Sequence, residues 1–135
     1  MNIELSSKQF RRLLDLVYIG NWVLNSARGA DRIPDFDKVE SHIFSQCPKF
    51  DMAALCEIQN GEIVPSHAFS EGGIHEAIMD YEDSVFYEIL AEELAHRDLH
   101  EGILPDSDEL PSRINSYMLE FERNGITNLN IDSDL

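Results

Sequence analysis

Apolar residues recur at helical spacing along most of the chain, and the longest such stretch is residues 80–102. Its apolar side chains repeat every three or four positions, and they are Tyr81, Val85, Phe86, Ile89, Leu90 and Leu94. This spacing predicts one continuous helix with a buried apolar stripe. Acids at its start and His96, Arg97 and His100 at its end suit the helix dipole. Gly102 supplies a left-handed stop.

A second strong helical pattern covers residues 7–28. Ser6 and Gln9 have the spacing of a capping box at its start. The apolar arc is wide, which predicts a helix that is buried on more than one side. Gly20 in its middle costs about 1 kcal/mol relative to Ala, which indicates either a close helix contact or a bend. Asn21, next to Trp22, is expected to be a buried polar group.

Shorter helical patterns complete the fold. One helix is predicted to start at Asp35 or Asp37 and to end before Pro48, a short one holds residues 75–79 and breaks near Asp80, and a last one runs to Gly125. The segment 2–5 alternates in polarity, and the segment 126–131 has the pattern of a short extended tail. Together they predict a short antiparallel β pairing of the N- and C-terminal segments. We therefore expect a mainly α protein, a single compact domain of about five helices over residues 1–135.

Asn60-Gly61 leaves the local fold open. The dipeptide lies between Glu57-Ile58-Gln59 and Glu62-Ile63-Val64, as in a type I′ hairpin. It could equally cap a helix that leads into an extended segment. We favour the helix cap, because Pro65 and the short arms leave little ladder to stabilise a hairpin.

Charge is the strongest compositional deviation. The chain of 135 residues has a formal net charge of −16, and residues 51–135 hold three basic against twenty acidic side chains. Nucleic-acid phosphates and anionic membrane surfaces would be repelled by that half, so both classes of partner are excluded. The N-terminal residues lack the layout of a signal peptide, and Cys47 and Cys56 match no metal or disulfide motif. We expect a cytoplasmic protein whose two thiols behave as small hydrophobes.

One candidate metal site lies on the helix at residues 80–102. Glu92, His96 and His100 are four residues apart, so they form one column on a helix face. Carboxylate and imidazole groups are ligands for zinc or iron, so a divalent metal is the cofactor that this pattern allows. The same histidines are also explained as cations near a helix C-terminus, in which case no cofactor is present.

The acidic side chains offer a second kind of site. Exposed acids in the segment 71–109 could form a docking face for a basic protein, and the candidates are Glu82, Asp83, Glu93, Asp106, Asp108 and Glu109. The same acids could serve solubility alone, or imitate nucleic acid. The wide apolar arc of the first helix could in turn form a homodimer seam.

Motifs for phosphate binding, dinucleotide binding and nucleophilic hydrolysis are missing from the chain. The leading hypothesis is therefore a non-enzymatic protein-interaction module with an acidic face. The alternative is a metal-binding protein or metal-dependent enzyme that uses Glu92, His96 and His100. Bound metal in the purified protein, lost on His96→Ala, would favour the alternative.

Overall fold

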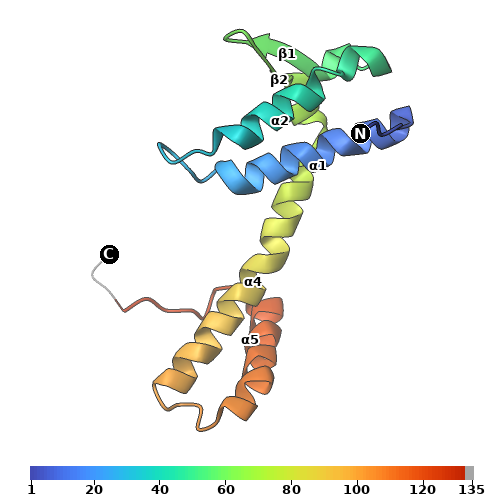
Figure 1. Ribbon diagram of the computed structural model, residues 1–135. Helices are drawn as coiled ribbons and strands as arrows, with labels where there is room; N and C mark the ends of the chain where they lie inside the picture. Colours follow the sequence, from blue (N-terminus) through green and yellow to red (C-terminus); the bar gives the residue numbers. More distant parts are fainter. Residues whose placement is uncertain (133–135) are drawn as a thin grey trace. The chain divides into compact units, whose positions relative to one another are not determined.

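The computed structural model describes residues 1–132 and has a mainly α fold with one short two-stranded antiparallel sheet (Figure 1). The chain divides into two compact units, Met1–Ile78 and Met79–Leu135. The helices are α1 (Ser7–Asn25), α2 (Pro34–Phe44), α3 (His67–Phe69), α4 (His75–His100) and α5 (Leu110–Asn124). The strands are β1 (Cys56–Gln59) and β2 (Glu62–Pro65). Short 3-10 turns lie at Cys47–Phe50, Ala53–Leu55 and Ser107–Glu109, and a π-helical turn lies at Ser70–Ile74. The mainly α fold is confirmed, and the organisation as a single domain stays a prediction.

The first unit is built around aromatic side chains from α1, α2 and α3. Its buried cluster consists of Phe10, Leu14, Phe44, Cys47, Phe69 and Ile74. Removing each large apolar side chain from water contributes about 1.5–3 kcal/mol, so this cluster stabilises the unit. The capping box that starts α1 is confirmed, because Ser6 Oγ accepts from the Gln9 amide at 3.2 Å and Gln9 Oε1 accepts from the Ser6 amide at 2.9 Å.

Gly20 of α1 does not make the close helix contact that its sequence position suggested. A Cβ atom added there would meet nothing within 4 Å. The helix also continues through it without interruption from Ser7 to Asn25. A close helix contact therefore does not explain the glycine, and a bend of α1 at this position stays a prediction.

The Asn60-Gly61 dipeptide forms a hairpin turn, so the expectation of a helix cap is wrong. Strand β1 pairs with β2 in antiparallel register, with Gln59 opposite Glu62 and Cys56 opposite Pro65. Asn60 and Gly61 have φ values of 53° and 81°, as a type I′ turn requires of both central residues. Pro65 is tolerated because it ends β2 at the edge of the ladder.

Helix α4 is continuous, which confirms one rod over residues 80–100. The expected break near Asp80 is wrong, since the helix already begins at His75. The irregular backbone lies earlier, in the π-helical turn, where Gly73 has a φ of 104°. Gly102, with a φ of 74°, follows the helix end and supplies the predicted left-handed stop.

The buried face of α4 differs from the predicted one. Ile89 is 56% exposed and Phe86 is 50% exposed, so much of the expected apolar stripe faces solvent. Within residues 80–100 the buried positions are instead Ala91, Ala95 and Asp98, which are four and three residues apart. Figure 1 shows α5 returning alongside α4. The Tyr87 ring of α4 packs against Phe121 of α5 at a centroid distance of 5.4 Å.

Asp98 connects α4 to α5 through a network of hydrogen bonds. Its side chain is 0% exposed. Arg113 Nε donates to Asp98 Oδ2 at 2.7 Å and Tyr117 Oη donates to the same oxygen at 2.5 Å, both from α5. Arg97, its neighbour on α4, donates to Oδ1 through Nη2 at 2.8 Å. Both oxygens of the buried carboxylate thereby accept hydrogen bonds, which is the condition for burying a charge.

The environment of Asp98 keeps it ionised. Burial by itself would raise the pKa of this carboxyl, but the hydrogen bonds from Tyr117, Arg97 and Arg113 outweigh burial and lower the pKa from 3.8 to about 2. The same contact raises the pKa of the Tyr117 hydroxyl, together with its own burial. The network therefore consists of one carboxylate and two guanidinium groups, and all three are ionised at neutral pH.

The expected β pairing of the chain ends is wrong for the described residues. Residues 1–6 and 126–132 contain no strand. After Gly125 the backbone keeps turning, because the Thr127 amide donates to Asn124 O at 3.2 Å and the Leu129 amide donates to Ile126 O at 3.0 Å. These amides are used locally and cannot pair with another segment. The last three residues of the chain lie outside the described part.

We predict that Asp98→Asn destabilises the protein by about 2 kcal/mol at pH 7 and flattens its acid sensitivity. The folded pKa lies below the unfolded value, so the carboxylate stabilises the fold above pH 4 and loses that contribution as the pH falls toward about 2. Urea unfolding followed by circular dichroism between pH 6 and pH 2 measures the free energy of unfolding for both proteins.

The control for this measurement is Asp83→Asn, which removes an exposed carboxylate from the same helix. It should keep the acid sensitivity of the parent protein. Equal pH profiles for the parent protein and Asp98→Asn would contradict a stabilising role for the buried carboxylate.

Candidate functional site

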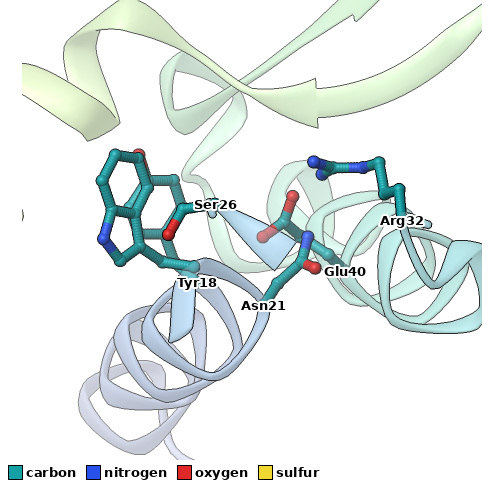
Figure 2. A pocket seen from close by; sticks show the side chains of 6 residues that line it. Tyr18, Asn21, Ser26, Arg32 and Glu40 are labelled. Atoms are coloured by element: carbon teal, nitrogen blue, oxygen red, sulfur yellow. The ribbon is translucent and has the colours of Figure 1, made fainter. Parts of the chain in front are cut away.

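The first unit contains a cleft of about 360 Å³ between α1 and α2, shown in Figure 2. Its walls combine aromatic, polar and charged side chains, and they are Tyr18, Asn21, Trp22, Ser26, Arg32 and Glu40. Tyr18, Asn21 and Trp22 are three and four residues apart, so one face of α1 presents them together. Figure 2 shows the Glu40 carboxylate and the Arg32 guanidinium across the cleft from the Tyr18 ring.

Two buried asparagines hold the α1 wall in place. Asn25 Nδ2 donates to Asn21 Oδ1 at 2.8 Å and to Ile33 O at 3.0 Å, while Asn25 Oδ1 accepts from the Ile33 amide at 2.8 Å. The loop between α1 and α2 is thereby tied back to α1. The prediction that Asn21 is buried is confirmed, and its amide donates to Asp37 Oδ1 at 3.0 Å.

Arg32 forms an ion pair with Asp37. Its Nε donates to Asp37 Oδ2 at 2.7 Å and its Nη2 donates to Oδ1 at 2.6 Å, in the two-pronged geometry that suits guanidinium and carboxylate. The hydrogen bond to Arg32 outweighs burial and lowers the pKa of Asp37. The positive charge that lines the cleft is therefore already neutralised by a neighbouring acid.

Glu40 has no such partner. Its side chain is half-buried, and it takes part in no ion pair among residues 1–132. Burial raises the pKa of the Glu40 carboxyl, Asn21 and Arg32 act in the opposite direction, and the negative charge of Asp37 adds to the rise. The negative charge of Glu40 also adds to the effect of burial in raising the pKa of Tyr18. The cleft thus holds a carboxylate whose ionised form is costly in the folded protein.

Aromatic rings form the opposite wall and are themselves fixed. Tyr18 Oη lies 2.7 Å from His75 Nε2, and the Trp22 ring meets the His75 ring edge-on at 4.8 Å between centroids. Trp22 nevertheless stays 37% exposed, so part of its face is open to a ligand. An aromatic wall opposite a carboxylate is suited to non-covalent recognition of a cationic group.

The predicted metal column lies on the outside of α4. Glu92, His96 and His100 are all exposed. No group of three or more His, Cys, Asp or Glu side chains within residues 1–132 is arranged to hold a metal ion. His75, which could have completed a metal site, is hydrogen-bonded to Tyr18 in the first unit. A divalent metal on α4 stays a prediction.

The predicted interaction acids are also at the surface. Glu82, Asp83 and Glu93 are exposed on α4, and Asp106, Asp108 and Glu109 are exposed before α5. Asp106 has a local structural role, because its Oδ1 accepts from the Asp108 amide at 3.0 Å and caps the 3-10 turn there. None of these six acids takes part in an ion pair between described residues, since both arginines paired in the second unit bind Asp98.

One exposed face of α4 carries two apolar side chains between two acidic ones. Glu82, Phe86, Ile89 and Glu93 are four, three and four residues apart, so they share one side of the helix, which we name the α4 outer face. It lies opposite the buried row that ends at Asp98. His96 and His100 continue the same face toward the end of the helix.

The sequence by itself did not point to the cleft. Asn21 beside Trp22 was the one local signal, since an amide within an apolar arc needs a buried partner. Glu40 and Arg32 gave no signal, because exposed and half-buried charges look alike in a sequence. Their role follows only from the packing of α1 against α2.

We predict that Glu40→Gln raises the thermal stability of the protein at pH 7. A raised folded pKa means that ionisation of Glu40 disfavours the fold, and this cost appears as the pH rises above the ordinary value of 4.5. The gain should therefore shrink to nothing when the melting temperature is measured near pH 3. Glu57→Gln, an equal charge change at an exposed position of the same unit, should leave the melting temperature unchanged. A lower melting temperature for Glu40→Gln at pH 7 would contradict the burial cost.

Comparison with known proteins leaves the chain without an identified relative. No protein-family model, no curated protein and no solved structure matches it. None of the helices within residues 1–132 has the length and the apolar character that are needed to cross a membrane.

Proposed function

We propose that this protein is a non-enzymatic protein-interaction module that binds a basic partner through the α4 outer face. The observation that carries the proposal is the pairing of acids and apolar side chains there. Phe86 and Ile89 are exposed between Glu82 and Glu93, and neither acid has an ion-pair partner among the described residues. The two free cysteines, Cys47 and Cys56, agree with the cytoplasmic location that we expect.

Electrostatics determines the kind of partner. Unpaired surface carboxylates attract basic proteins over several ångströms and speed their association. Exposed aromatic and aliphatic side chains supply the apolar contact that charge alone lacks. A partner helix with lysine or arginine on both sides of an apolar stripe would satisfy both features of the α4 outer face.

A labelled amphipathic peptide with a lysine-rich polar face provides the test. We expect it to bind the full chain, measured by fluorescence anisotropy, and to bind much less tightly when the ionic strength rises from about 0.01 M to about 0.15 M. The triple variant Glu82→Gln, Asp83→Asn, Glu93→Gln should weaken binding about tenfold or more, because charge-assisted contacts are lost.

The matched control carries Glu57→Gln, Glu62→Gln and Glu71→Gln. It has the same change of net charge, but its three exposed positions lie in the first unit. This variant should bind almost as well as the parent protein. If both triple variants weaken peptide binding equally, net charge alone explains the effect and a site on α4 is rejected.

Self-association through α1 is a second candidate function, supported by a different surface. Leu16 is 69% exposed and Val23 is 68% exposed, and Gly20 lies between them on the same side of the helix. An apolar groove of about 1120 Å³ continues along Leu13 and Leu16 to the N-terminal segment. Residues 1–50 carry seven basic and six acidic side chains, so two copies would meet here without strong repulsion.

A single charge should disrupt that contact. We predict that Val23→Asp lowers the oligomeric mass measured by light scattering after size-exclusion chromatography. Val39→Asp places the same charge on α2, at another exposed valine, and should leave the mass unchanged. A parent protein that is monomeric at the highest concentration tested would reject the α1 seam.

A further inference from the structure

We propose that the cleft between α1 and α2 binds a guanidinium group, held between the Trp22 and Tyr18 rings on one side and the Glu40 carboxylate on the other. The cleft lies within the first unit. It uses none of the residues of the α4 outer face, so the two sites can be tested separately.

The charge of the cleft favours a cation. Arg32 and Asp37 neutralise each other through two hydrogen bonds of 2.7 and 2.6 Å. Glu40 is left without an ion-pair partner among residues 1–132. Arg32 and Glu40 line the cleft, and together with Asp37, which pairs with Arg32 from outside the lining, they give a net charge of −1. An anion would face this carboxylate, and it would find the Nε and Nη2 donors of Arg32 already used.

A bound cation would also offset the unfavourable burial of the ionised Glu40 carboxylate. Burial makes the ionised form of Glu40 unfavourable, and a charge-assisted hydrogen bond from a ligand would stabilise that form. The Asn21 amide and the Arg32–Asp37 pair keep this side of the cleft ordered before a ligand arrives. A pre-organised site loses less entropy on binding than a flexible one.

The aromatic wall favours guanidinium over ammonium. A planar guanidinium can stack on an indole or phenol ring and still donate two parallel hydrogen bonds to a carboxylate, whereas a compact ammonium cannot do both. The Trp22 ring is positioned by its edge-on contact with His75 at 4.8 Å, and Tyr18 by its bond to the same histidine. A volume of about 360 Å³ accommodates the guanidinium together with part of an aliphatic stem.

The intrinsic fluorescence of Trp22 reports binding directly, because it is the single tryptophan of the chain. The probe is N-acetyl-L-arginine amide, whose only charge is the guanidinium, titrated into the full chain at constant ionic strength. The matched probe is N-acetyl-L-citrulline amide, which has nearly the same shape without the charge. We expect saturable quenching by the arginine probe, and binding of the citrulline probe that is about tenfold or more weaker.

A pair of variants locates the site. Glu40→Gln keeps the shape of the side chain, should remain folded because it removes a half-buried charge, and should weaken the arginine probe about tenfold or more. Glu57→Gln should bind the probe as the parent protein does, since this residue is exposed and does not line the cleft. Unchanged binding by Glu40→Gln, or equal binding of the arginine and citrulline probes, would overturn the site.

Two further probes define the ligand. N-acetyl-L-lysine amide should bind more weakly than the arginine probe, and tighter binding would overturn the assignment to guanidinium. Free L-arginine shows whether the guanidinium group comes from a polypeptide or from a small molecule. Tighter binding of the blocked residue would assign the cleft to an arginine side chain within a polypeptide, and tighter binding of the free amino acid would assign it to a small guanidinium compound.

Discussion

The second unit depends on the burial of one carboxylate. Asp98 is fully enclosed on the face of α4 that also carries Ala91 and Ala95, and Arg113 and Tyr117 reach it from α5. Ala91 and Ala95 contribute little apolar area, so the hydrogen-bond network adds to the apolar contact that Tyr87 and Phe121 make between the two helices. Removal of one member of such a network leaves a buried charge without its partner, which costs several times more than loss of an exposed pair.

The same network shapes the surface of that unit. Residues 51–135 contain only three basic side chains, and Arg97 and Arg113 are both directed at Asp98. The internal requirement for two cations therefore leaves the exposed acids of α4 without ion pairs among the described residues. The acidic character of the surface follows from the excess of twenty acidic over three basic side chains, and it is the property on which binding of a basic partner would depend.

The first unit uses its polar residues in the opposite way. There Asn21, Asn25 and the Arg32–Asp37 pair satisfy one another and fix the loop between α1 and α2. Glu40 is the charged residue of this group without an ion-pair partner among residues 1–132. It is half-buried, burial raises the pKa of its carboxyl, and it lines the same cleft as the exposed Trp22. A group that is unfavourable for the stability of the fold is a common sign of a binding site, because the ligand compensates for it.

The sequence by itself determined the local structure: the capping box of α1, the continuity of residues 80–100, the stop at Gly102 and the mainly α class. These features depend on neighbouring residues, so their signals lie within a few positions of each other. Tertiary structure alone decided which side of α4 is buried, because hydrophobicity favours Ile89 and Phe86 over the Ala91, Ala95 and Asp98 row. It also decided the hairpin at Asn60-Gly61 and placed Trp22 and Glu40 in one cleft. A buried aspartate and a cleft both require residues that are distant in the sequence to come together, and neighbouring residues carry no signal of this.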